Sequence, residues 1–218
     1  MFEYKGIKIR WHGHDTFSLE KGLTICIDPY KLSRSIPADI VLISHNHFDH
    51  MSFEDLKKTS SSNTVIIAAK ECVSQLSKVT SRELIGILPG QEKIVNNVKV
   101  KAIPAYNIDK INPDTSKPFH PKEDNKIGFI VNIENVSIYH TGDSDLIPEM
   151  TDLRPDILLV PVSGTYVMTA KEAAKATEKI KPKIAIPMHY GTIVGSEADA
   201  KELKAMVKSC EVQILTKE

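Results

Sequence analysis

The chain has 218 residues, and its 28 lysines and arginines balance 28 aspartates and glutamates. A formal charge of zero gives no electrostatic reason to expect nucleic acid or an anionic membrane as a partner. The length favours a single domain over residues 1–218. Three scattered cysteines, no apolar run of membrane-spanning length and no signal-peptide pattern favour a cytoplasmic protein that does not insert into membranes.

The first segments are predicted strands. Residues 7–11 alternate with period two, and residues 16–20 and 23–28 follow the same pattern. His14 lies in the polar stretch between the first two, which is either a plain loop or part of a site. Asp28 closes the third strand before a proline. It either forms a turn or accepts the second ring N–H of a metal-bound histidine, as such histidines commonly require.

A metal-binding motif follows the next strand. Residues 39–44 form a short apolar run that is typical of a buried strand. Directly after it, three of the chain's eight histidines fall within six residues and enclose an aspartate. His45 and His47, two residues apart, can bind one ion from the same side. Asp49 and His50 lie round the following turn and can bind a second ion.

The middle of the chain continues as alternating strands and short helices. The predicted elements are a helix capped by Ser52 and ending near 58, a strand at 64–68, a short helix at 70–78, a strand at 84–88, and a hairpin of 93–95 with 98–102. Residues 106–126 form a long polar loop with three prolines. Loops of this length in compact domains are usually functional or disordered. Because this loop follows a strand that should reach the edge with the metal-binding motif, we expect an active-site loop.

The last part repeats the strand and helix alternation. The predicted elements are a hairpin of 127–133 with 136–139, strands at 157–160 and 183–187, a helix at 169–180, a helix capped by Ser196, and a closing strand at 211–215. Asp143 follows one of these strands and His189 another. Together the two β-α halves predict an α/β protein with two mixed sheets.

The pattern His-x-His-x-Asp-His after a strand resembles the signature of the metallo-β-lactamase superfamily. The resemblance implies a four-layer αββα sandwich, in which the two mixed sheets pack face to face and two metal ions lie at one edge. Asp143 resembles the ligand that bridges both metals. His189 resembles the final ligand of the second metal.

One position departs from the superfamily pattern. Asn107 stands where a histidine normally completes the first metal site. An amide oxygen is a weak ligand for Zn²⁺, which prefers nitrogen and sulfur. We favour His120, in the long loop, as the replacement ligand, and Asn107 would then hold the loop or contact substrate. Zn²⁺ is the expected metal, while a site richer in oxygen ligands would favour Mn²⁺ or Fe²⁺.

Further phrases resemble one branch of the superfamily. These are Gly13-His14, Asp28-Pro29, and the stretches at 140–145, 161–165 and 187–191. The branch contains ascorbate-6-phosphate lactonase, N-acylphosphatidylethanolamine phospholipase D and many predicted metal-dependent hydrolases.

This resemblance implies that a metal-bound hydroxide at a dinuclear site attacks an ester-type bond of a small molecule: a lactone, a carboxylic ester or a phosphodiester. Asp49 would be both ligand and catalytic residue, orienting the nucleophile. Tyr190 is a candidate for lining the substrate pocket. The sequence is compatible with a homo-oligomer and does not fix the oligomeric state.

Two rival functions fit the sequence less well. The first is a non-catalytic metal-binding or regulatory protein that retains the site. Asn107, at the position of a ligand histidine, is the residue that favours it. An oxidoreductase of the di-iron flavoprotein branch is disfavoured, because that branch carries glutamate where this chain has His47.

Overall fold

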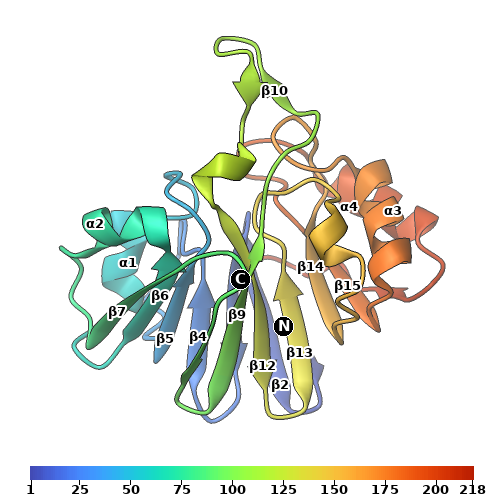
Figure 1. The fold of residues 1–218 in the computed structure, drawn as a ribbon. Helices are drawn as coiled ribbons and strands as arrows, with labels where there is room; N and C mark the ends of the chain where they lie inside the picture. Colours follow the sequence, from blue (N-terminus) through green and yellow to red (C-terminus); the bar gives the residue numbers. More distant parts are fainter. The chain divides into compact units, whose positions relative to one another are not determined.

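The computed structural model describes residues 1–218 and divides into two compact units. Unit 1 comprises residues 1–88 together with 215–218, and unit 2 comprises residues 89–214. Each unit contains one seven-stranded mixed sheet, and Figure 1 labels most of their strands. No helix of the chain is both long enough and apolar enough to cross a bilayer.

The sheet of unit 1 runs in chain order from β1 to β7. Its strands are β1 (Phe2–Tyr4), β2 (Ile7–Gly13), β3 (Thr16–Glu20), β4 (Thr24–Ile27), β5 (Ile40–Ile43), β6 (Val65–Ala69) and β7 (Glu83–Ile87). The first four strands pair antiparallel, and β4 to β7 pair parallel. β2, β4 and β5 therefore all end at the same edge of the sheet, which brings the segments that follow them together.

Two short helical segments accompany this sheet. They are α1 (Phe53–Thr59), and the 3₁₀ turn η1 (Lys70–Cys72) that runs into α2 (Val73–Leu76). The Ser52 hydroxyl accepts a hydrogen bond from the amide of Asp55 at 3.3 Å, so the predicted cap of α1 is confirmed. The helix predicted at 70–78 is broken into two pieces and ends before Ser77.

The sheet of unit 2 has the order β16-β15-β14-β13-β12-β9-β8. Its strands are β8 (Glu92–Val95), β9 (Val98–Pro104), β12 (Ile127–Ile133), β13 (Val136–His140), β14 (Ile157–Pro161), β15 (Ile184–Met188) and β16 (Glu211–Val212). β13 to β16 pair parallel, and the others pair antiparallel. Asn96 and Asn97 turn β8 into β9 with φ values of 50° and 63°, the conformation that a tight two-residue hairpin requires.

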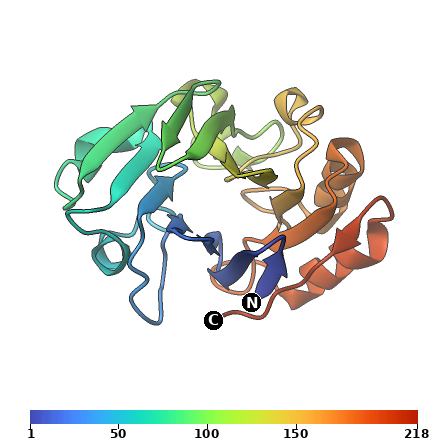
Figure 2. The same cartoon turned by 90° about the horizontal axis from the view of Figure 1, so that it is seen from below.

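Two longer helices lie against one face of this sheet, as the orange and red ribbons of Figure 2 show. They are α3 (Ala170–Ile180) and α4 (Glu197–Met206). Thr169 and Glu172 form the predicted capping box of α3. Ala173 and Ala176 are fully buried, so the small side chains let the helix lie close to the strands.

The hydrophobic core of each unit lies along its parallel strands. All four residues of β5 are fully buried, and the residues of β14 are buried throughout. Burial of each such aliphatic side chain stabilises the fold by roughly 1.5–3 kcal/mol. This core fixes the strand ends that carry the polar segments described below.

Three segments differ from the sequence-based expectations. The long loop contains a small hairpin, β10 (Ile111–Asn112) with β11 (Lys117–Pro118), and a 3₁₀ turn, η2 (Lys122–Asp124). The closing strand stops at Val212 instead of 215, because the last residues leave the sheet and join unit 1, where the amide of Glu218 donates to the Trp11 carbonyl at 3.0 Å. β1 was not predicted.

Candidate metal centre

The motif histidines after β5 converge at their ring nitrogens. Nε2 of His45 lies 3.0 Å from Nδ1 of His47, and His45 is buried. The hydroxyl of Ser44 lies 2.9 Å from Nδ1 of His45 and fixes that ring from behind. The structure thus places the two histidines as neighbours on one side, as the two-residue spacing predicts.

His50 is oriented by Asp28. Nδ1 of His50 lies 2.9 Å from Oδ2 of Asp28, so the ring donates to the carboxylate. The carboxylate is itself held by Ser44, whose amide and hydroxyl donate to it at 2.8 and 2.6 Å. Asp28 adopts a φ of 45°, a strained conformation for a residue other than glycine and one that often marks functional sites. A proton on Nδ1 leaves the lone pair of His50 on Nε2.

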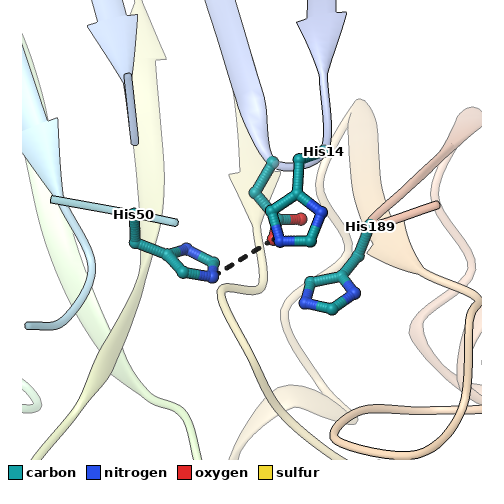
Figure 3. A group of neighbouring side chains, drawn as sticks. His14, His50 and His189 are labelled. Carbon is teal, nitrogen blue, oxygen red and sulfur yellow. Dashed lines mark ion pairs between the residues drawn. The ribbon is translucent and has the colours of Figure 1, made fainter. Parts of the chain in front are cut away.

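The turn after β2 carries two further groups to this edge. Nε2 of His14 lies 2.9 Å from Oδ2 of Asp49. Asp15 is fully buried, and its Oδ2 lies 3.5 Å from Nε2 of His50, the contact dashed in Figure 3. Sequence reasoning singled out His14 but missed Asp15. An available signal was its position beside His14 in a turn at the edge where the motif strand ends.

A second group of donors lies in unit 2. Oδ2 of Asp143 is 3.3 Å from Nε2 of His120 and 3.4 Å from Nε2 of His189. Two ligands about 2.1 Å from one tetrahedral ion would be about 3.4 Å apart. The histidine of the long loop and the histidine after β15 therefore meet the same carboxylate at a spacing that suits metal ligands.

Asn107 and Ser163 hold these two histidines. Oδ1 of Asn107 accepts from the backbone amide of His120 at 2.9 Å and lies 2.9 Å from its Nδ1. The Asn107 amide nitrogen donates to the Tyr166 carbonyl at 2.9 Å. The hydroxyl of Ser163 lies 2.9 Å from Nδ1 of His189. In this structure Asn107 supports the loop and its histidine, the role expected for it if His120 is the ligand.

Tyr190 follows His189 and is buried. Burial raises the pKa of its phenol to about 12, so the hydroxyl stays protonated at neutral pH. A neutral phenol can donate a hydrogen bond to a substrate oxygen, and Tyr190 keeps its place among the substrate-lining candidates.

The donor set suits divalent metal ions. His50, His120 and His189 are each held at Nδ1 and each present Nε2 towards a carboxylate oxygen. Metal-bound histidines are commonly oriented in this way through their second ring nitrogen. Burial of nitrogen and carboxylate donors side by side is costly unless a cation or proton compensates their lone pairs and charge. These residues therefore fit bound metal.

Comparison with known proteins agrees with this chemistry. Residues 8–189 match the beta-lactamase superfamily domain. A protein of Archaeoglobus fulgidus named UPF0173 metal-dependent hydrolase is 32% identical over 93% of this chain and 91% of its own length. The crystal structure of a candidate metal-dependent hydrolase from Parabacteroides distasonis has a TM-score of 0.81 and 31% identity, covering 96% of this chain and 94% of that one.

A metallo hydrolase from Ignicoccus hospitalis shares the fold with a TM-score of 0.78 at 23% identity, over 97% of this chain and 95% of its own. The chain thus belongs to the metallo-β-lactamase superfamily, whose αββα fold class was predicted and is confirmed. Within that superfamily it is one of the UPF0173 metal-dependent hydrolases. The prediction of an enzyme is confirmed at this level.

Proposed function

We propose that the protein binds two divalent metal ions and hydrolyses an ester-type bond of a small molecule. The observation that carries this proposal is the common arrangement of three histidines, each held at Nδ1 with Nε2 directed at a carboxylate. The proposed ligands of unit 1 are His45, His47, Asp49 and His50, and those of unit 2 are His120, Asp143 and His189.

The metals and the side chains have separate tasks in this proposal. When bound at these residues, divalent cations would lower the pKa of a water towards about 7 and polarise the bond under attack. Asp49 accepts a hydrogen bond from His14 through Oδ2, and its side chain is partly exposed. In this proposal Oδ1 of Asp49 takes up the proton of the attacking water and passes it to the leaving group. Tyr190, neutral at pH 7, would donate to a substrate oxygen.

Zn²⁺ is the metal that the histidine-rich part of this set favours, since Zn²⁺ is commonly bound by imidazole and carboxylate together. The substrate classes that fit are lactones, carboxylic esters and phosphodiesters, because each offers a polarisable oxygen and an oxygen leaving group. The zero formal charge of the chain argues for a small substrate instead of a nucleic acid.

The test is turnover of generic esters, lactones and phosphodiesters by metal-loaded wild type and by Asp49→Ala. We expect the variant to keep its fold, measured by circular dichroism, and to lose at least about a hundredfold in rate, the usual worth of a positioned acid–base group. An unchanged rate would remove Asp49 from the mechanism.

A second candidate is a metal-binding or regulatory protein without turnover. Asn107, which stands where the superfamily has a ligand histidine, is the observation that favours it. Two bound metals without hydrolysis of any of these substrates would establish this alternative. The position of His120 beside Asp143 favours the enzyme, because it supplies the nitrogen that Asn107 lacks.

A further inference from the structure

Asp15 lies deep in unit 1, close to residues of the proposed ligand set. The sequence did not predict Asp15 itself as a ligand. Its Oδ2 is 3.5 Å from Nε2 of His50 and 3.9 Å from Nε2 of His14. Oδ2 of Asp49 is 3.9 Å from the same Nε2 of His50. Asp15 is fully buried, and His14 and His50 are as well.

The orientation of the His50 ring decides which of its nitrogens Asp15 faces. A carboxylate only accepts, so the 2.9 Å contact with Asp28 places the ring proton of His50 on Nδ1. The other ring nitrogen, Nε2, then faces Oδ2 of Asp15. A buried imidazole nitrogen and a buried carboxylate oxygen in this arrangement are suited to a cation placed between them.

The distances favour a metal cation over a proton. A hydrogen bond between nitrogen and oxygen spans about 2.7–3.2 Å, which is shorter than the 3.5 Å observed between His50 and Asp15. Two ligands of one tetrahedral ion are about 3.4 Å apart. The same spacing occurs in unit 2, where Asp143 lies 3.3 Å from His120 and 3.4 Å from His189.

The turn that carries Asp15 is held firmly in place. The indole N–H of Trp11 donates to the His14 carbonyl at 2.8 Å, and the hydroxyl of Thr16 donates to the Asp28 carbonyl at 2.7 Å. Gly13, with a φ of 101°, and His14, with a φ of 52°, form a tight reversal after β2. The carboxylate therefore has a fixed position, as metal ligands need.

We propose that Asp15 is a ligand of the metal ion bound by His50, in addition to Asp49. The inference rests on the proposed dinuclear site and deepens it. A second carboxylate adds an oxygen ligand and a negative charge to this metal site. The preference of the site then shifts from Zn²⁺ towards Mn²⁺ or Fe²⁺. His14 is then a positioning residue, because its Nε2 donates to Asp49 at 2.9 Å instead of facing the ion.

The experiment compares wild type, Asp15→Asn and the control Asp156→Asn. Asp156 is a buried carboxylate of unit 2 that pairs with Lys183 at 2.7 Å before β14, at the opposite ends of the parallel strands from Asp143. Metal-free protein is titrated separately with Mn²⁺ and Zn²⁺. Bound metal is counted by mass spectrometry after dialysis, and bound Mn²⁺ is followed by electron paramagnetic resonance.

We expect Asp15→Asn to lose at least about tenfold in Mn²⁺ affinity at one of the two sites. A loss of this size already follows when a hydrogen-bond partner of a metal ligand is replaced. Zn²⁺ affinity should fall less, so that the Zn²⁺-to-Mn²⁺ preference rises. Asp156→Asn should keep both affinities. Metal-free Asp15→Asn should unfold at the same or a higher temperature than metal-free wild type, because the charge of a fully buried carboxylate has been removed.

Unchanged Mn²⁺ and Zn²⁺ affinities in Asp15→Asn would overturn the proposal. A lower unfolding temperature of the metal-free variant together with unchanged metal binding would identify Asp15 as a structural ion-pair partner instead. Wild type that binds neither metal would refute the dinuclear site itself, which is a different result. Asp15→Ser, with the same measurements, replaces the asparagine variant if that variant does not fold.

Discussion

Asp28 orients the ring of His50, which is one of the proposed metal ligands. The Asp28 carboxylate accepts a hydrogen bond from Nδ1 of His50 at 2.9 Å. The opposite nitrogen, Nε2, is then the one that could bind a metal ion. Ser44 in turn fixes the carboxylate through two hydrogen bonds. The sequence pattern Asp-Pro after a strand indicated either a turn or this role, and the structure shows the contact.

Asp28→Asn should therefore weaken metal binding without removing a ligand. We expect a loss of about tenfold to a hundredfold in affinity, the range seen for partners of ligand histidines. Metal titration of the two proteins measures it. Asp39→Asn is the matched control, because Asp39 precedes β5 and accepts from the Thr24 amide at 2.8 Å at the other end of β4. Equal affinities in wild type and Asp28→Asn would contradict the orienting role.

His12 makes the folded state sensitive to acid. It is buried with Nε2 2.8 Å from the Ser18 hydroxyl, and desolvation lowers its pKa from 6.5 to about 4. Between these values the unfolded chain binds a proton that the folded chain does not, so the free energy of unfolding falls as the pH falls from 6.5 to 4. The full loss from this residue is about 3 kcal/mol.

His12→Gln should flatten this dependence. Chemical denaturation of metal-free wild type and variant at several pH values gives the two slopes, and the difference between them isolates His12 from the other histidines. We expect the variant to lose less stability than wild type between pH 6.5 and 4. Parallel curves would show that burial does not depress the pKa of this ring.

The loop at 106–126 is anchored by a small network of charged side chains. Asp145 accepts from the amide of Ile108 at 2.7 Å, and the ammonium group of Lys110 lies 3.4 Å from Asp145 and 2.9 Å from Glu172 at the start of α3. These contacts tie the loop that carries His120 to the body of unit 2. The prolines and polar residues of the loop predicted a functional segment but not its hairpin.

Lys110→Met should loosen this loop. We expect amide hydrogen exchange in residues 106–126 to rise by about tenfold, because local opening needs less free energy once the ion pairs are lost. Lys117→Met is the control, since Lys117 is an exposed residue of β11 in the same hairpin. Exchange that is unchanged in Lys110→Met, or raised equally in the control, would contradict the anchoring.

The sequence predicts an element well when the residues that specify the element lie close together in the chain. β5 and the motif after it were predictable, because an apolar run and the adjacent histidines specify them within about ten residues. The capping box of α3 is equally local. Asp15 is not predictable in this way, because its proposed role depends on His50, which is 35 positions further along the chain. The sequence kept both Asn107 and His120 open, and their mutual hydrogen bond appears only in the folded loop.

Each of the two units carries some of the proposed metal ligands. Unit 1 supplies the motif residues and Asp15, and unit 2 supplies His120, Asp143 and His189. Because metal ions that bind the folded chain stabilise it by mass action, a free concentration a hundred times the dissociation constant adds about 2.7 kcal/mol per site.

Removal of metal should accordingly lower the thermal unfolding temperature. We expect chelator-treated protein to unfold at a lower temperature than untreated protein, and the original value to return when metal is restored. Calorimetry on the same preparation measures both transitions. An identical unfolding temperature with and without metal would contradict the binding of ions by the folded state.

The most direct test of the two-metal centre is the metal content per chain, measured by mass spectrometry on wild type and His120→Ala side by side. We predict two metals in wild type and about one in the variant, since the loop histidine would complete one of the two sites. Two metals in the variant would take His120 out of the ligand set. One metal or none in reloaded wild type would contradict the dinuclear mechanism.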